Sequence, residues 1–362
     1  MGNPKNKITA KESCIVQLIL QAEDLIKWYD KEKRDLAFRD IQDPYKIWLS
    51  EIMLQQTKVD TVIPYFQKWI KKYPTIKDVA KAEITDLLIS WEGLGYYRRC
   101  HNFHKASKII SQEHGGQIPT SWDILIKLPG IGEYTAAAVL SIAFGQKFPV
   151  LDGNVKRVMS RFLGIKVLSV NNLKKIKKVL NLSIPAKNPG DFNQSIMELG
   201  ALICSPRTPK CFKCPISSIC KAALSSNPES YPKKTKKGKV PHFTLISCIL
   251  KKDDLFLIHK RENNMMLGGL WELPNVKVEN KLLTKPFIKK ALEKELKIKV
   301  KNISKSCTVK HSYSHFSVTM HCFNCEISNS EIILDDNYYW ILKKDISKYP
   351  FSKVHHKIFN SL

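Results

Sequence analysis

The segment Leu128-Pro-Gly-Ile-Gly-Glu-Tyr-Thr-Ala-Ala-Ala-Val139 carries two glycines, separated by one residue, where a short helix ends and a helix of small residues begins. Gly130 and Gly132 let backbone amides approach a ligand closely, and the N-terminus of the following helix favours an anion. Such a turn can hold a DNA phosphate without reading the base sequence. An ordinary corner between two helices would use the same residues, so this motif alone leaves both interpretations open.

The residues on both sides of this turn also have helical spacing. Between about Ser13 and Ala223, apolar side chains recur three and four residues apart, as in Val59, Val62 and Phe66. We therefore expect residues 1–224 to form an all-α domain. Residues 225–241, SSNPESYPKKTKKGKVP, contain too few apolar side chains to bury and are expected to form a linker.

A different pattern follows the linker. Residues 243–248 alternate in the manner of a strand, Asp253-Asp254 offers a turn, and LFLIHKR at 255–261 is expected to return as a second strand. A helix is expected around residues 287–296, and one long alternating strand over Cys307–Ile327. Residues 242–362 should therefore form an α+β domain, which makes the chain multidomain.

Composition limits the class of protein and of partner. A length of 362 residues suggests two domains, and 43% hydrophobic residues indicate a folded protein. The formal net charge of +26 favours a polyanion such as nucleic acid or an anionic membrane surface, although a lysine-rich proteome would give the same excess. Met1–Lys11 is polar, and we find no run of about eighteen apolar residues, so we expect a soluble, intracellular (cytoplasmic) protein with no membrane partner.

Four cysteines gather in one short loop, Cys204-x6-Cys211-x2-Cys214-x5-Cys220. Four thiolates suit an iron-sulfur cluster or zinc, and the spacing favours the cluster because it contains a single C-x2-C pair. Arg207, Lys210 and Lys213 in this loop can present positive charge to a phosphate backbone. The separate pair Cys322-x2-Cys325 lies in an alternating segment and is interpreted as packing.

Two candidate catalytic carboxylates, Glu51 and Asp152, belong to segments in which a helix is expected to begin. In DPYKIWLSEIMLQQT, Asp43 and Pro44 begin a helix that places Glu51 on an apolar stripe, where burial raises the pKa as a general acid requires. The alternative is a structural glutamate bonded to backbone or arginine. In VLDGNVKRVMSR, Asp152 precedes a basic helix and by itself would be only an N-cap.

Together, SEIMLQQT, LGYYRR, LPGIGEYTAAAV, LDGNVKR and the cysteine loop resemble the helix-hairpin-helix DNA glycosylases, and specifically the MutY-type adenine glycosylases. The resemblance implies a helix-hairpin-helix domain with a [4Fe-4S] cluster on the four loop cysteines. Its catalytic residues fall on Glu51, Asp152, Asn154 and Tyr134 in this chain. Its DNA-contacting residues in this domain fall on Arg34, Leu54, Gln56, Tyr96, Gly130 and Gly132.

Two positions are informative when the chain is compared with the family. One differs from the usual family residue, and the other distinguishes two branches of the family. Phe38 stands in RDLAFR where the family usually has Trp, which changes one apolar contact. Tyr134 stands where the bifunctional endonuclease III branch has a lysine nucleophile, and a phenol cannot form the Schiff base needed for strand cleavage. The resemblance therefore implies base excision alone.

The C-terminal half resembles the Nudix-like damage-recognition domain of the same enzymes. GGLWELPNV at 268–276 matches its core segment, and HSYSHF at 311–316 matches the loop that recognises 8-oxoguanine, through Tyr313, Ser314 and His315. A polar turn between strands is the alternative for that loop. FIKKALEKEL lacks the carboxylate spacing that Nudix hydrolases use for magnesium, so we expect this domain to bind rather than hydrolyse.

The resemblance implies a monomeric enzyme that removes adenine paired with 8-oxoguanine or guanine in double-stranded DNA. Glu51 would protonate the flipped purine, and Asp152 would stabilise the positively charged sugar that results. Two rival interpretations remain at this point: a different, lyase-type helix-hairpin-helix glycosylase, and a catalytically silent DNA-binding module.

Overall fold

The computed structural model describes residues 18–19, 21–225, 227–233, 238, 240–279, 283–296, 299–313, 315–327 and 337–362. The chain divides into two compact units. The first unit comprises Met1–Ala80 and Lys105–Lys236, and the second comprises Lys81–His104 and Lys237–Leu362. The expected linker contributes to the first unit, because the Lys233 amide donates to the Lys166 carbonyl oxygen at 2.8 Å.

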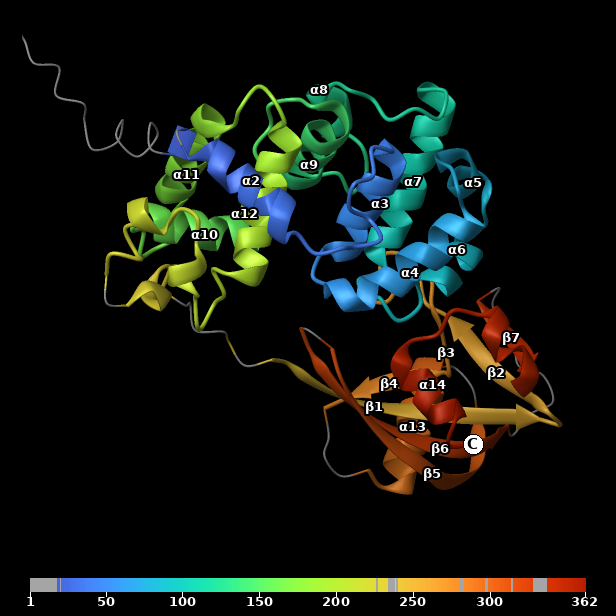
Figure 1. The fold of residues 1–362 in the computed structure, drawn as a ribbon. Helices are drawn as coiled ribbons and strands as arrows, with labels where there is room; N and C mark the ends of the chain where they lie inside the picture. The colour runs from blue at the N-terminus through green and yellow to red at the C-terminus, as the bar shows by residue number, and fades with distance from the viewer. Residues whose placement is uncertain are drawn as a thin grey trace, which may run out of the picture. The chain divides into compact units, whose positions relative to one another are not determined.

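The first unit is helical, as predicted from the apolar spacing (Figure 1). Helix α7 (Arg98–Glu113) runs from the second unit into the first, and α6 (Ile84–Trp91) belongs to the second. The remaining helices of the described part of the first unit are α2 (Ala22–Glu32), α3 (Pro44–Leu54), α4 (Val59–Lys72), α5 (Ile76–Lys81), α8 (Trp122–Leu125), α9 (Glu133–Phe144), α10 (Gly153–Leu163), α11 (Val170–Ser183) and α12 (Pro189–Leu202), with 3-10 turns η1 (Cys211–Lys213), η2 (Ser217–Ile219) and η3 (Pro228–Ser230).

Local sequence accounts for the ends of the helices that matter for the site. Asp43 caps α3 by accepting from the amides of Tyr45 and Lys46, and Pro44 occupies the first helical position. Helix α10 ends at Gly164, whose φ of 68° lies in the left-handed region that favours glycine. Both predicted helix starts, at Asp43 and at Asp152, are confirmed.

The core of the first unit brings distant segments together. Helix α12 packs against α2, α9 and α10, and α3 packs against α9. The buried side chains of this core include Phe162, Ile176 and Phe192. Because α3, α9, α10 and α12 converge, residues more than a hundred positions apart in the chain face one another.

The second unit is built on a mixed sheet in the order β3-β2-β1-β6-β5, with β4 paired to β1 and β7 paired to β2 (Figure 1). Strands β1 and β6 are parallel, and the other paired strands are antiparallel. The elements are β1 (His242–Lys252), β2 (Leu255–Lys260), β3 (Trp271–Glu272), β4 (Asn275–Val278), α13 (Lys285–Leu296), β5 (Val300–Ser312), β6 (Ser317–Ile327), β7 (Tyr338–Leu342), η4 (Lys343–Lys348) and α14 (Lys353–Phe359).

The first hairpin and the helix of this unit are confirmed, but the single strand predicted over Cys307–Ile327 is wrong. That segment contains the end of β5, a turn closed by the bond from the Tyr313 amide to the Phe316 carbonyl oxygen, and the whole of β6. Alternation continues through both strands, and the turn lacks the Gly, Pro or Asn-Gly signal that usually marks a hairpin, so the pattern gave no break.

Within the described part of the chain, the structure holds no helix both long enough and apolar enough to cross a bilayer.

Candidate active site

A cavity of about 670 Å³ opens in the first unit, and it is large enough for one planar base. Helices α3, α9, α10 and α12, together with the 34–39 segment, form its walls. The structure brings together here most of the residues that the sequence singled out in this unit: Arg34, Glu51, Leu54, Gln56, Gly130, Gly132, Tyr134, Asp152 and Asn154.

Glu51 lies at the wall of this cavity with only 8% of its surface exposed. The Tyr134 hydroxyl donates to its Oε2 at 2.5 Å. Burial raises the pKa of Glu51, and the hydrogen bond from Tyr134 and the positive charge of Arg39 offset only part of that rise. The carboxyl group thus tends to hold its proton, as a general acid must.

Asp152 combines the two roles that the sequence left open. Its Oδ1 accepts from the Val155 amide at 2.6 Å, so it is the N-cap of α10. Its side chain also lines the cavity that Glu51 lines. Burial raises the pKa of Asp152, while the amides of Val155 and Asn154 act in the opposite direction by stabilising the ionised form.

Asn154 is held in the first turn of α10. Its Oδ1 accepts from Arg157 Nη2 at 2.9 Å, and Arg157 also donates to the Gly200 carbonyl oxygen at 2.7 Å. A Cβ atom at Gly200 would lie 2.7 Å from the Asn154 Cβ, so glycine is required for this close approach. The packing of α12 on α10 therefore positions Asn154.

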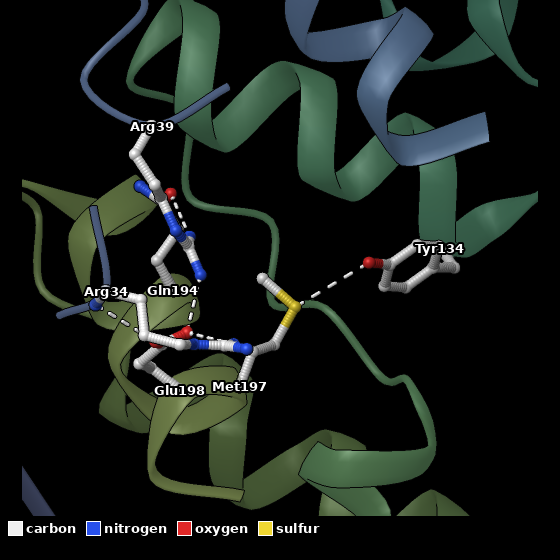
Figure 2. Close-up of polar contacts among 6 residues, drawn as sticks. All are labelled: Arg34, Arg39, Tyr134, Gln194, Met197 and Glu198. Atoms are coloured by element: carbon white, nitrogen blue, oxygen red, sulfur yellow. Dashed lines mark hydrogen bonds and ion pairs between the residues drawn. The ribbon is translucent and has the colours of Figure 1, made fainter. Parts of the chain in front are cut away.

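An ionic network on α12 was not expected from the sequence (Figure 2). Arg34 donates from Nε and Nη2 to the two oxygens of Glu198 at 2.6 and 2.9 Å, and Arg39 Nη2 donates to Oε2 at 2.7 Å. Arg39 also donates to Gln194 Oε1 at 2.5 Å. Burial alone would raise the pKa of Glu198, but the two guanidinium groups outweigh it and hold the pKa below its usual range.

Arg34, Arg39 and Glu198 line the same cavity, where they form a charged wall, and Gln194 lines the cavity beside them. Glu198 is 1% exposed, so its charge depends on the two arginines. Figure 2 also shows Tyr134 directed toward Met197, with its hydroxyl 3.6 Å from the sulfur. The sequence did contain one signal for this network, since Glu198 is the acidic residue of the otherwise apolar helix segment SIMELGAL. Its partners Arg34 and Arg39 lie 164 and 159 residues away in the chain, so the pattern could not identify them.

Two predicted DNA-contacting residues have unusual backbone conformations. Gln56, at the rim of the cavity, has φ of 58°, and Tyr96, in the second unit, has φ of 50°. Residues other than glycine seldom adopt this region, and such strain concentrates at functional sites. The tyrosine ring lies 5.4 Å from the His315 ring, also in the second unit, so two of the predicted residues are brought together.

The glycine turn has the form that the sequence predicted. Gly130 has φ of 78°, and exposed Gly132 begins α9 without any side-chain cap. The first amides of a helix with no side-chain cap suit an anion.

The 311–316 segment is only partly described. Tyr313 is half-buried and stacks on Phe316 with ring centroids 4.4 Å apart, so one face of its ring is already covered. His315 is exposed at the turn. Ser314 lies outside the described residues.

Cys204, Cys211, Cys214 and Cys220 line one small pocket below α10 and α12. Burial raises the pKa of Cys214 to about 12, and it also raises the pKa of Cys211 and Cys220. Burial and clustering of thiols in one pocket fit a soft metal centre, whose positive charge would favour the thiolates. No three His, Cys, Asp or Glu side chains in the described ranges converge tightly enough to hold one single ion.

Arg161, which is only 2% exposed, binds the first part of this loop. Its guanidinium donates to the carbonyl oxygens of Cys204 (3.2 Å), Ser205 (2.7 Å), Pro206 (3.2 Å) and Tyr231 (3.0 Å). Its Nη1 also lies 3.2 Å from the Cys204 sulfur. Arg157 adds a bond to the Cys204 carbonyl oxygen at 2.8 Å. Arg207, Lys210 and Lys213 are exposed on the same loop.

Comparisons with known proteins agree with this geometry. A model of the HhH-GPD superfamily of base excision DNA repair proteins matches residues 49–182, and a NUDIX domain model matches residues 246–361. The adenine DNA glycosylase of Buchnera aphidicola subsp. Schizaphis graminum is 38% identical over 81% of this chain and 84% of its own length. Those of Schizosaccharomyces pombe and Homo sapiens are 34% and 30% identical, over 90% and 92% of this chain and 85% and 72% of their own lengths.

Solved structures show the same helical fold. A thermostable thymine-DNA glycosylase is 29% identical with a TM-score of 0.53, over 57% of this chain and 95% of its own. A trapped endonuclease III-DNA covalent intermediate is 22% identical with a TM-score of 0.51, over 58% of this chain and 97% of its own, and it supports the fold alone.

Proposed function

Because the chain belongs to the adenine DNA glycosylase family of base excision repair enzymes, we propose that the cavity of the first unit is its active site. The cavity of the first unit takes an adenine flipped out of double-stranded DNA and hydrolyses its N-glycosyl bond. The observation that carries the proposal is the placement of two carboxyl groups with raised pKa, Glu51 and Asp152, in one cavity.

Glu51 acts first, as the general acid. It donates its proton to N7 of the purine, which makes neutral adenine the leaving group when the bond to C1′ breaks. The ionised Glu51 then accepts the proton of the water that attacks C1′, so the carboxyl group is restored. The Tyr134 hydroxyl orients Glu51 throughout by donating to Oε2.

Asp152 stabilises the positive charge that develops on the sugar. Loss of adenine leaves an oxocarbenium-like deoxyribose, and a carboxylate at the cavity wall stabilises it electrostatically or by a transient bond to C1′. The amides of Val155 and Asn154 hold the side chain in place for this purpose. Asn154, bound by Arg157, supports the same end of α10.

The charged wall of Arg34, Arg39 and Glu198 reads the edge of the base. Both oxygens of Glu198 already accept from the two arginines, so the carboxylate holds the two guanidinium groups, which offer hydrogen-bond donors at fixed positions. A purine presents donors and acceptors on its edge, so a fixed pattern of this kind can discriminate among bases. Leu54, Gln56, Gly130 and Gly132 contact the DNA around the opening, with Gln56 wedging beside the flipped base.

The reaction stops at base removal. The position of the lysine nucleophile of lyase-type relatives is occupied by Tyr134, whose pKa burial raises far above its usual range. A neutral phenol cannot form a Schiff base with the sugar. The product is an intact strand with an abasic site.

The four loop cysteines are proposed to hold a [4Fe-4S] cluster. Four partly buried thiols around one pocket supply a suitable donor set, and the protein gives Cys204 additional bonds from Arg161. When bound, the cluster would staple the loop, so that Arg207, Lys210 and Lys213 present their charges to the DNA backbone.

The second unit is proposed to recognise 8-oxoguanine, or guanine, opposite the adenine. Tyr313, Ser314 and His315 carry this role, and the ring contact between His315 and Tyr96 is the support from within the unit. We propose a monomer, and an intracellular, cytoplasmic location, where DNA is accessible and thiols stay reduced.

A single-turnover assay on defined duplexes tests the function. With adenine opposite 8-oxoguanine, we expect release of free adenine and strand breakage only after alkali treatment. Breakage without alkali would indicate a lyase-type enzyme instead. Tight binding of the duplex without adenine release would identify a silent binding module.

A further inference from the structure

A second group of cysteines lies in the sheet of the second unit, separate from the loop at residues 204–220. Cys248 is on β1, Cys307 on β5, and Cys322 and Cys325 on β6, and each is a free thiol. Cys322 and Cys325 are three residues apart on one strand, so they face opposite sides of the sheet. Each therefore meets a different neighbour.

Cys307 and Cys322 face each other directly. They are register partners in the antiparallel pair of β5 and β6, and Cys307 adds to the effect of burial in raising the pKa of the Cys322 thiol. Both pack in the core cluster that contains Val318 and Met320. Directly opposed residues in such a pair have Cα atoms about 4.5 to 5.5 Å apart. This separation falls inside the range of about 4.4 to 6.8 Å that disulfides span.

Cys248 and Cys325 are close but badly placed for a covalent bond. Cys325 contributes to the raised pKa of Cys248, yet β1 and β6 are parallel and Cys325 is in register with Leu250, not with Cys248. An offset of two residues, at about 3.3 Å per residue, and a strand spacing of about 4.8 Å put their Cα atoms roughly 8 Å apart. That separation exceeds the range for disulfides.

Exposure also distinguishes the two pairs. Cys307 is partly exposed, so a dissolved oxidant can reach its sulfur, whereas Cys322 is 0% exposed behind it. Cys248 and Cys325 are 0% and 5% exposed, so neither sulfur of that pair is open to attack.

We propose that Cys307 and Cys322 are a site of reversible oxidation, at which a small disulfide such as oxidised glutathione converts the thiol pair into a cross-strand disulfide. The Cys307 thiolate attacks the small disulfide, forming a mixed disulfide and releasing one small thiol. The Cys322 thiolate then attacks the Cys307 sulfur and displaces the second small thiol. The protein loses two hydrogen atoms and two electrons, and the small disulfide gains them.

The disulfide would link the two strands of the β5–β6 hairpin, whose register is irregular. The pairing of β5 with β6 shifts between Lys305 and Cys307, so the disulfide lies immediately beside the irregularity. The loop it closes contains the end of β5 and the start of β6. Oxidation therefore restricts the conformational freedom of the β5–β6 hairpin. The thiols on β1 and in the loop at residues 204–220 are unchanged.

The test uses the full-length protein with its metal centre loaded, equilibrated with mixtures of reduced and oxidised glutathione, alkylated and digested with trypsin. Cleavage after Lys305 and Lys310 releases Cys307 on a short peptide, while Cys322 and Cys325 share one fragment. We expect a cross-linked peptide lighter by two hydrogen atoms in the wild type and in Cys325→Ser and Cys248→Ser. We expect none in Cys322→Ser, where Cys307 stays as a mixed disulfide with glutathione.

Hydrogen exchange of the unmutated chain gives a second measurement that needs no variant. Amides of β5 and β6 should exchange more slowly in the oxidised protein and regain their original rate on reduction. The proposal is overturned if Cys307 of the wild type accumulates only as the mixed disulfide, if a Cys248–Cys325 cross-link forms as readily, or if the oxidised hairpin exchanges at the reduced rate.

Discussion

At the scale of single residues, the pKa of Glu51 links activity to stability. Because the pKa is raised in the folded state, its contribution to stability is present below the unfolded pKa of about 4.3 and is lost as pH rises through the folded value. Glutamine cannot ionise, so Glu51→Gln removes this pH-dependent loss of stability. We expect no adenine release, nearly unchanged duplex binding, and a gain of about 0.5 to 2 kcal/mol in unfolding free energy at neutral pH.

Thermal unfolding at neutral and acid pH checks this expectation, because the gain should vanish at acid pH. Exposed Glu113 provides the control, since Glu113→Gln should change neither stability nor rate. A Glu51→Gln enzyme with near-normal single-turnover rates would remove this residue from the mechanism.

Tyr134→Phe changes the same carboxyl group in a predictable direction. The hydroxyl donates to Oε2 of Glu51 and so lowers its pKa. Without that bond the pKa of Glu51 rises further, and the pH at which the single-turnover rate falls should move upward. A pH–rate profile that stays in place or moves to lower pH would show that Glu51 does not act as the acid.

At the scale of elements, helix α10 allows the two roles of Asp152 to be separated. Asparagine is as good an N-cap as aspartate, whereas alanine costs about 0.5 to 2 kcal/mol of stability. We expect Asp152→Asn and Asp152→Ala both to lose adenine release, and only the alanine variant to unfold at lower temperature. Full activity in the asparagine variant would leave Asp152 as a cap alone.

The cysteine loop is the second element that can be tested by itself. Purified wild-type protein should be brown, with about four irons per chain, and Cys211→Ser should lose the colour and much of its affinity for duplex DNA. Cys307→Ser is the matched control, because that cysteine lies in the sheet and should leave iron content unchanged. A colourless wild type holding one zinc would contradict the cluster.

At the scale of the whole molecule, the preference for the base opposite adenine should reside in the second unit. Replacing Ser314 and His315 together by Ala should lower the ratio of the excision rate from A:8-oxoguanine to that from A:G. The loss should correspond to about 1 to 3 kcal/mol of free-energy preference, as for two lost hydrogen bonds to a base edge. The comparison uses single-turnover rates on both duplexes. An unchanged ratio would move lesion recognition to the first unit.

The sequence was informative wherever chemistry depends on local order. Asp43, Asp152 and the glycine turn each sit at a helix start that neighbouring residues specify, so the helical half and the positions of both carboxylates could be predicted. The turn between β5 and β6 was missed because its residues resemble a continuing strand. Glu198 was missed because its partners, Arg34 and Arg39, meet it only through tertiary packing.

The bonds that Arg161 makes with the carbonyl oxygens of residues 204–206 bear on how the enzyme matures. They shape the segment around the first cysteine through bonds that the protein supplies. Assembly of the proposed cluster would therefore remove less backbone entropy than it would from a loose loop. We expect a chain stripped of iron to keep this segment in shape and to take up iron again without refolding.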